Sequence, residues 1–103
     1  MAGKRWIAAS LTSKPRLDVY NPNKSQILSF MKNEGRIDGV AEGYVVNYRT
    51  SLPVVPNKVD LSFSMGNMCW CLEDVWNLEH NDMELNPEFV EAALAHINGT
   101  AHD

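Results

Sequence analysis

The segment from Val59 to Met65 constrains the fold more strongly than any other part of the sequence. Apolar and polar residues alternate through it as Val-Asp-Leu-Ser-Phe-Ser-Met, and Gly66-Asn67 follows. A period of two is typical of a β-strand with one buried face, and Gly-Asn is a turn signal. The chain therefore has to build a sheet whose apolar face other elements cover.

Helix signals appear at three places. In the last one, Asn86 is a favourable N-cap, Pro87 fits the first helical position and Gly99 ends the helix. Its predicted buried stripe consists of Phe89, Val90, Ala93, Leu94 and Ile97.

A second helix of about ten residues should follow Asn23, which forms an approximate capping box with Gln26. We expect Gly35 to be the left-handed residue just beyond its end. Three- and four-residue spacing of apolar side chains predicts a third helix from Met68 to Leu78, with a further strand as the alternative.

The other strands are predicted from shorter patterns. Arg5–Leu11 and Leu17–Tyr20 would form a hairpin, and a strand Tyr44–Arg49 would follow a turn between Asp38 and Gly43. Because Pro53 and Pro56 remove backbone donors, the segment 50–57 is predicted to be a connection or an edge.

Together these elements predict an α+β fold in one domain, residues 1–103. The expected order is two strands, helix, two strands, two helices, with a small, mostly antiparallel four-stranded sheet and about three helices. A chain of 103 residues with 45% hydrophobic residues is long enough for one core.

Charge is distributed unevenly along the chain. All nine Lys and Arg residues lie at or before Lys58, and nine of the thirteen acidic residues follow it. If the C-terminal helices share a face, that face would attract a basic protein and repel nucleic acid. The competing interpretation is that these acids pair with the basic half of the same fold or favour the start of the last helix.

The leading functional hypothesis is a non-catalytic interaction or inhibitor protein that docks this acidic face on a basic surface of a larger partner. A nucleic-acid-handling protein, whose substrate the acids would mimic, is one such partner. Inhibitors made by phages or mobile elements, including inhibitors of CRISPR machinery, are one setting for this design. The predicted partner-binding residues are Glu73, Asp74, Trp76, Glu79, Asp82, Glu84, Glu88 and Glu91.

The alternative hypothesis is a small nucleic-acid-binding module that uses the basic N-terminal half. Aromatic residues lie close to cations there and could stack on bases, although the same side chains could serve as core. The residues assigned to this role are Lys4, Arg5, Trp6, Tyr48 and Arg49.

A Cys/His metal site is a lesser alternative. Cys69 and Cys71 lie two residues apart, with His80, His96 and His102 after them, and this spacing differs from that of common zinc sites. We therefore predict structural cysteines, no metal and no cofactor. Glu73 and Asp74 are adjacent and would point apart on a helix, so neither they nor a Cys/His pair gives positive support for catalysis.

The sequence also bears on location and assembly. No window approaches the length of a membrane span, and two cysteines without a secretion signal indicate a reducing, cytoplasmic location. Five methionines and three tryptophans are compatible with a homodimer interface as well.

Overall fold

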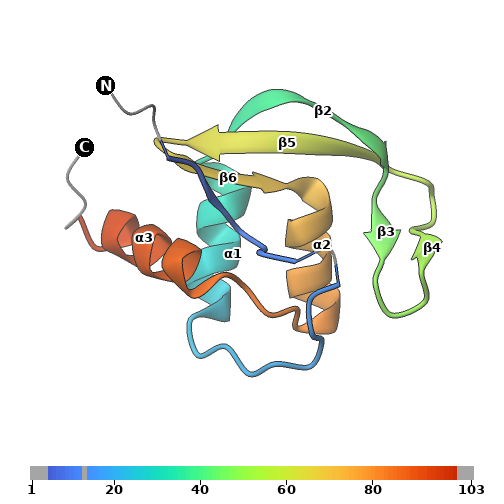
Figure 1. The fold of residues 1–103 in the computed structure, drawn as a ribbon, viewed down its shortest axis with the longest axis horizontal. Helices are drawn as coiled ribbons and strands as arrows, with labels where there is room; N and C mark the ends of the chain where they lie inside the picture. The colour runs from blue at the N-terminus through green and yellow to red at the C-terminus, as the bar shows by residue number, and fades with distance from the viewer. Residues whose placement is uncertain (1–4, 13, 100–103) are drawn as a thin grey trace.

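The fold of the protein is α+β in a computed structural model that describes residues 5–12 and 14–99 (Figure 1). The main sheet is mostly antiparallel, as predicted, with only its outermost β1–β6 pair parallel. Its strands lie in the order β1 (Ile7–Ala8), β6 (Met68–Cys71), β5 (Val59–Met65) and β2 (Arg36–Tyr44). This sheet has four strands, as predicted, but the described residues also form a second sheet of two strands, so the strand count and the order of elements along the chain differ from the prediction.

The helices of the described residues lie together below the sheet in Figure 1. They are α1 (Lys24–Asn33), α2 (Leu72–Asn81) and α3 (Pro87–Ile97). A separate two-stranded sheet, β3 (Val46–Asn47) and β4 (Leu52–Pro53), lies at the far end of β2. None of these helices is long and apolar enough to cross a membrane.

Trp70 is the centre of the core between the sheet and the helices. Its side chain is 2% exposed, and its ring centroid lies 5.4 Å from that of Phe30 and 5.8 Å from that of Phe89. Its Nε1 donates a hydrogen bond to the carbonyl oxygen of Met31 at 3.2 Å. One residue of β6 thus fixes α1 and α3 against the sheet.

Several local predictions are confirmed. Strand β5 has the predicted bounds, and α1 follows Asn23. Helix α3 begins at Pro87, the Asn86 side chain accepts a hydrogen bond from the Glu88 N–H at 3.1 Å, and Gly99 has a φ of 71°. These features depend on residues close to one another in the sequence.

The predicted helix from Met68 to Leu78 is wrong over its first residues. Gly66 has a φ of 60° and turns the chain back, so that Met68–Cys71 pairs with β5 before α2 begins at Leu72. Met68 and Trp70 are buried while Cys69 and Cys71 are partly exposed. The apolar spacing that favours a helix therefore belongs to two elements, and the weaker alternative of a further strand holds for 68–71.

The predicted hairpin of the first two strands does not form. Leu17–Tyr20 is not a strand, and it runs beside the segment between α2 and α3, where the N–H groups of Asp18 and Val19 each donate a hydrogen bond at 2.9 Å. Their acceptors are the carbonyl oxygens of Asn81 and Asp82. Strand β1 instead pairs with β6, more than fifty residues away.

The prediction of a turn between Asp38 and Gly43 is also wrong. Strand β2 runs through this segment with two irregularities in its pairing to β5. Of the predicted strand Tyr44–Arg49, only Tyr44 at the end of β2 and Val46–Asn47 in β3 are in strands. Pro53 lies in β4 at an edge, which is one of the two predicted places for it.

Both end signals proposed for α1 act differently from the prediction. Asn23 makes no side-chain cap hydrogen bond. Gly35 does not have a positive φ, and it is a packing glycine instead, because a Cβ atom there would lie 2.4 Å from Cζ2 of Trp70.

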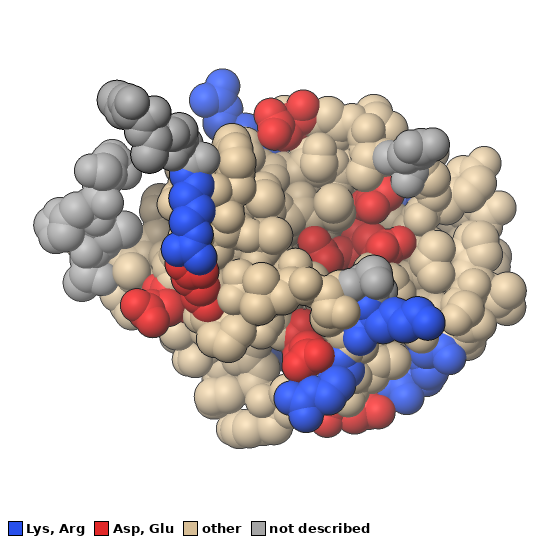
Figure 2. Space-filling view, viewed as in Figure 1, with Lys and Arg blue, Asp and Glu red and all other residues tan. Residues whose placement is uncertain are grey.

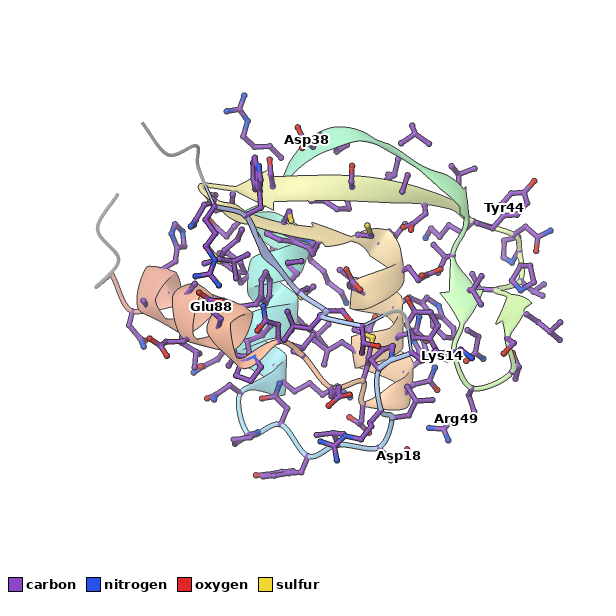
Figure 3. All side chains as sticks on the ribbon, viewed as in Figure 1. Lys14, Asp18, Asp38, Tyr44, Arg49 and Glu88 are labelled. Atoms are coloured by element: carbon purple, nitrogen blue, oxygen red, sulfur yellow. The ribbon has the colours of Figure 1, made fainter. Side chains whose placement is uncertain are left out.

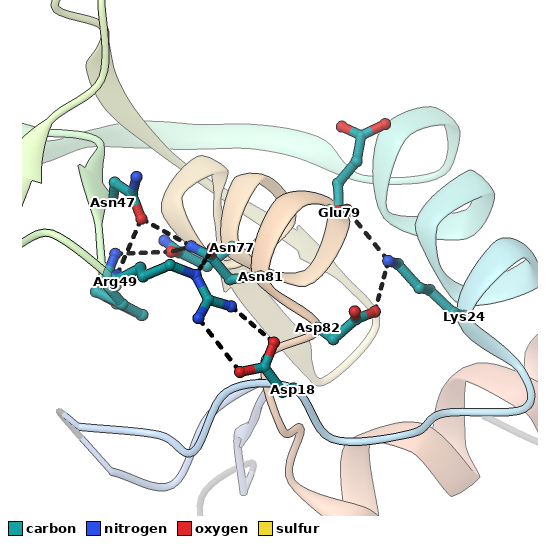
Figure 4. Close-up of polar contacts among 9 residues, drawn as sticks. Asp18, Lys24, Asn47, Arg49, Asn77, Glu79, Asn81 and Asp82 are labelled. Carbon is teal, nitrogen blue, oxygen red and sulfur yellow. Dashed lines mark hydrogen bonds and ion pairs between the residues drawn. The ribbon is translucent and has the colours of Figure 1, made fainter.

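A buried polar network fixes the β3–β4 hairpin to α2 (Figure 4). Asn77, which is fully buried, accepts a hydrogen bond from the Tyr48 N–H and donates to the carbonyl oxygen of Val46 at 2.8 Å. The Asn81 amide donates to Asn47 and accepts from Arg49 Nε. Every buried side-chain polar atom of the described residues has a partner, so the network is complete.

We predict that Gly35→Ala lowers the free energy of unfolding by about 1 to 3 kcal/mol, because the added Cβ overlaps the indole of Trp70. Urea denaturation followed by tryptophan fluorescence measures this. Gly39→Ala is the matched control, since a Cβ there meets only Ser62 Oγ at 3.7 Å. Equal destabilisation by both variants would contradict the packing role of Gly35.

We predict that Asn77→Ala lowers the free energy of unfolding by roughly 2 to 5 kcal/mol, because it leaves the Tyr48 N–H and the Val46 carbonyl without their partner. The same denaturation assay applies. Asn33→Ala is the control, because Asn33 is exposed and its side chain bonds only to Ser29. A loss no larger than that of the control would show that the network adds little stability.

Candidate protein-binding surface

The acidic residues of the C-terminal half lie beside the cations of the N-terminal half. Figure 2 shows blue and red side chains next to one another on this face instead of in separate regions. Four of the predicted partner-binding acids form ion pairs: Glu79 with Lys32, Asp82 with Lys24, Glu84 with Arg16 and Glu88 with Arg5, at N···O distances of 2.7 to 3.1 Å. For these four residues, the structure shows the internal pairing that the competing interpretation predicts.

The positions of α1 and the N-terminal segments explain this pairing. Helix α1 packs beside α2, so Lys24 and Lys32 meet Asp82 and Glu79. Hydrogen bonds from Lys32 lower the pKa of Glu79, and hydrogen bonds from the backbone and side chain of Arg16 lower the pKa of Glu84. Charges that are distant in the sequence are thus neighbours in space.

Glu73 and Asp74 point into the molecule. The Glu73 carboxylate accepts hydrogen bonds from the Val46 N–H and the Tyr48 hydroxyl, and Asp74 accepts one from the Cys71 N–H at 2.9 Å. Asp60, which is buried, accepts a hydrogen bond from the Glu73 N–H at 3.0 Å. These three carboxylates cluster at the start of α2, where Glu73 and Asp74 are partly buried and accept hydrogen bonds from within the molecule.

Burial at the start of α2 raises the pKa values of two of these carboxyl groups, Asp60 and Asp74. Burial raises the pKa of Asp74 to about 6, and the nearby charges of Asp60 and Glu73 add to this effect. The hydrogen bond from the Cys71 N–H acts in the opposite direction and lowers it. Burial also raises the pKa of Asp60, and burial with the hydrogen bond to Glu73 raises that of Tyr48. Protonation of Asp74 therefore occurs close to neutral pH.

Trp76 and Glu91 complete the predicted contact set. The ring of Trp76 is partly exposed and stacks on His80 with centroids 4.1 Å apart. Glu91 lies exposed on α3 and forms no ion pair with another described residue. Of the predicted acids, Glu91 is the one on the surface whose charge stays uncompensated.

The residues of the nucleic-acid hypothesis are not brought together. Arg5 pairs with Glu88 at one end of the molecule, whereas Arg49 binds Asp18 at the other, as the labelled side chains in Figure 3 show. The Tyr48 hydroxyl is engaged with Glu73, and Trp6 is 53% exposed. Lys4 lies outside the described residues.

The cysteines lie on β6 of the main sheet, and both are partly exposed. Burial raises the pKa of the Cys71 thiol to about 12, with Asp74 adding to the effect, and it also raises that of Cys69. Both thiols are therefore protonated at neutral pH, which disfavours a role as nucleophile. Within the described part of the chain, no group of three or more His, Cys, Asp or Glu residues could hold a metal ion, and His102 lies outside that part.

Sequence reasoning missed a hollow of about 560 Å³ beside α3, between this helix and the segment 16–23. We call it the α3 hollow. Apolar side chains line most of it, with three charged residues: Arg16, Glu84 and Glu91. Tyr20, which is 87% exposed, also lines it. The apolar alternation at 17–20 is its only sequence signal, and that alternation predicts a strand.

Comparisons with protein families, with curated proteins and with solved structures found no match to this chain.

We predict that the free energy of unfolding rises by on the order of 1 kcal/mol as the pH falls from 7 to 5, because the folded state takes up a proton at Asp74 that the unfolded state does not. The raised pKa means that this stability is lost as the pH rises through about 6. Hydrogen bonds from their cationic partners lower the pKa values of Asp18, Glu79 and Glu84, so these three acids lose their contribution only at lower pH.

Urea denaturation across this pH range measures the effect, and Asp74→Asn is the matched variant because its amide oxygen still accepts the Cys71 N–H. The variant should flatten the dependence on pH. If it keeps the slope of the unsubstituted protein, another group is responsible.

Proposed function

We propose that this protein is a non-catalytic interaction protein that binds a basic surface of a larger protein partner through the acidic side of its C-terminal helices. A protein that handles nucleic acid offers such a surface. The observation that carries the proposal is the α3 hollow, since it combines an apolar lining with carboxylates.

The lining of the α3 hollow defines what it would accept. Leu85, Val90 and Leu94 supply apolar area, and Glu91 supplies negative charge. Glu84 also lines the hollow, where it is paired with Arg16. Binding energy at protein interfaces is concentrated where an aromatic or Arg side chain fills such a site, because water is excluded around it. A side chain with an apolar stem and a cationic end, or an apolar residue next to a Lys or Arg, matches both features.

The intramolecular ion pairs do not prevent this binding. The paired side chains keep between 30% and 78% of their surface exposed, and exposed pairs contribute only about 0 to 1 kcal/mol each. A basic partner can therefore take the place of Arg16 or Arg5 at little energetic cost. Glu91 forms no ion pair with another described residue, so a basic partner can bind it without displacing a cation.

The proposal is tested by affinity capture from a nuclease-treated lysate of the native host, compared at low and high salt. We expect the protein to retain a basic protein that high salt releases. Tyr20→Ser and Glu91→Lys should each reduce retention by about tenfold, since both remove a complementary feature of the α3 hollow.

Leu11→Ser is the matched control, because Leu11 is 77% exposed and does not line the α3 hollow. Circular dichroism of each variant establishes that it folds. Equal retention by all variants would contradict the proposed surface, and retention that disappears with nuclease would move the assignment to nucleic acid.

A further inference from the structure

A second surface, on β2 and its neighbours, exposes large apolar side chains. Ile37, Val40 and Val55 are 68%, 70% and 94% exposed, and Tyr44 and Val59 are about half exposed. We call these five residues the β2 strip. Strand β2 is an edge of the main sheet, and Figure 1 places it on the side of the helices opposite to the segment that borders the α3 hollow.

The strip is continuous with the face of the sheet that the core uses. Ile37 pairs with Phe63 across the strands, and Tyr44 pairs with Val59. Cross-strand partners point to the same face, and Phe63 stacks on Trp70 in the core. The apolar face thus extends from β6 through β5 to β2, and the helices leave its β2 end uncovered.

Backbone hydrogen bonds bring Val55 to the same region. The Val45 N–H donates to the carbonyl oxygen of Lys58, and the Val45 carbonyl accepts from the Val54 N–H at 3.0 Å. In the sequence, Tyr44 precedes Val45, Val55 follows Val54 and Val59 follows Lys58. The backbones of Tyr44, Val55 and Val59 therefore lie close together where β2 meets the hairpin.

The area of the strip is close to what a dimer needs. Its exposed surface is on the order of 600 Å², at the top of the range of about 300 to 600 Å² for the largest apolar patch of a monomer. A standard interface takes roughly 800 Å² from each partner, and homodimer interfaces are the more apolar ones.

We infer that the β2 strip is the interface of a two-fold homodimer, in which the strip of one copy packs on the strip of the other. A two-fold contact brings a surface onto itself, so a patch of one charge would repel its copy. This strip has apolar side chains, and its exposed neighbours Arg36, Asp38 and Lys58 have mixed signs. Strand β2 has two irregularities in its pairing with β5, and such irregularities bend a strand and disfavour edge-to-edge pairing, so the contact is by side chains and not by a continuous sheet.

The mass in solution tests this inference. Sedimentation equilibrium over a range of concentrations should give twice the chain mass of 11.6 kDa. Val40→Lys should weaken the dimer by about 100-fold, because its charge would be buried without a partner. Leu11→Lys, at an exposed apolar residue outside the strip, should not change the dimer. A monomer at all concentrations, or a dimer that Val40→Lys leaves intact, would overturn the inference.

Cross-linking locates the contact even if Val40→Lys fails to fold. Near a two-fold axis a residue meets its own counterpart, so Val40→Cys should cross-link to itself with a short bismaleimide in a background of Cys69→Ser and Cys71→Ser. Leu11→Cys in the same background should remain uncross-linked. The reverse result would place any dimer elsewhere. Because the capture assay uses Tyr20 and Glu91, failure of the dimer leaves the proposed partner surface untouched.

Discussion

The indole of Trp70 joins the sheet to two of its helices, and the rest of the core depends on it. It contacts Phe30 of α1 and Phe89 of α3, its N–H is bonded to Met31, and Gly35 leaves room for its ring. A residue in a four-residue strand can have this role only because β6 is central in the sheet, between β1 and β5. Its packing explains why the helices gather on one face.

Away from this core, polar groups organise the structure. Asn77 and Asn81 fix the β3–β4 hairpin to α2, and the carboxylates of Asp60, Glu73 and Asp74 receive backbone hydrogen bonds at the junction of β5, β3 and α2. Close carboxylates repel one another, and burial strengthens the effect. Protonation of a carboxylate at the start of α2 therefore changes the stability of the fold directly.

The two proposed contact surfaces differ in chemistry and in position. The α3 hollow combines apolar side chains with Glu91 and the Arg16–Glu84 ion pair, which suits a basic partner. The β2 strip has no charged member, which suits a second copy. Because the two surfaces lie on opposite sides of the helical layer, a dimer formed through the β2 strip would leave both of its α3 hollows open. A partner with repeated basic surfaces would then bind the dimer more tightly than it binds one hollow.

The sequence by itself determined the elements that depend on near neighbours: β5 through its alternation, and α3 through Asn86, Pro87 and Gly99. It also predicted the α+β class. The tertiary structure decided which elements meet, because strand pairing and ion pairing join residues far apart in the chain. β1 pairs with β6 and not with Leu17–Tyr20, and packing of α1 beside α2 neutralises acids that the sequence separates from every Lys and Arg. The α3 hollow and the β2 strip arise in the same way, since burial of an apolar side chain is set by its neighbours in space.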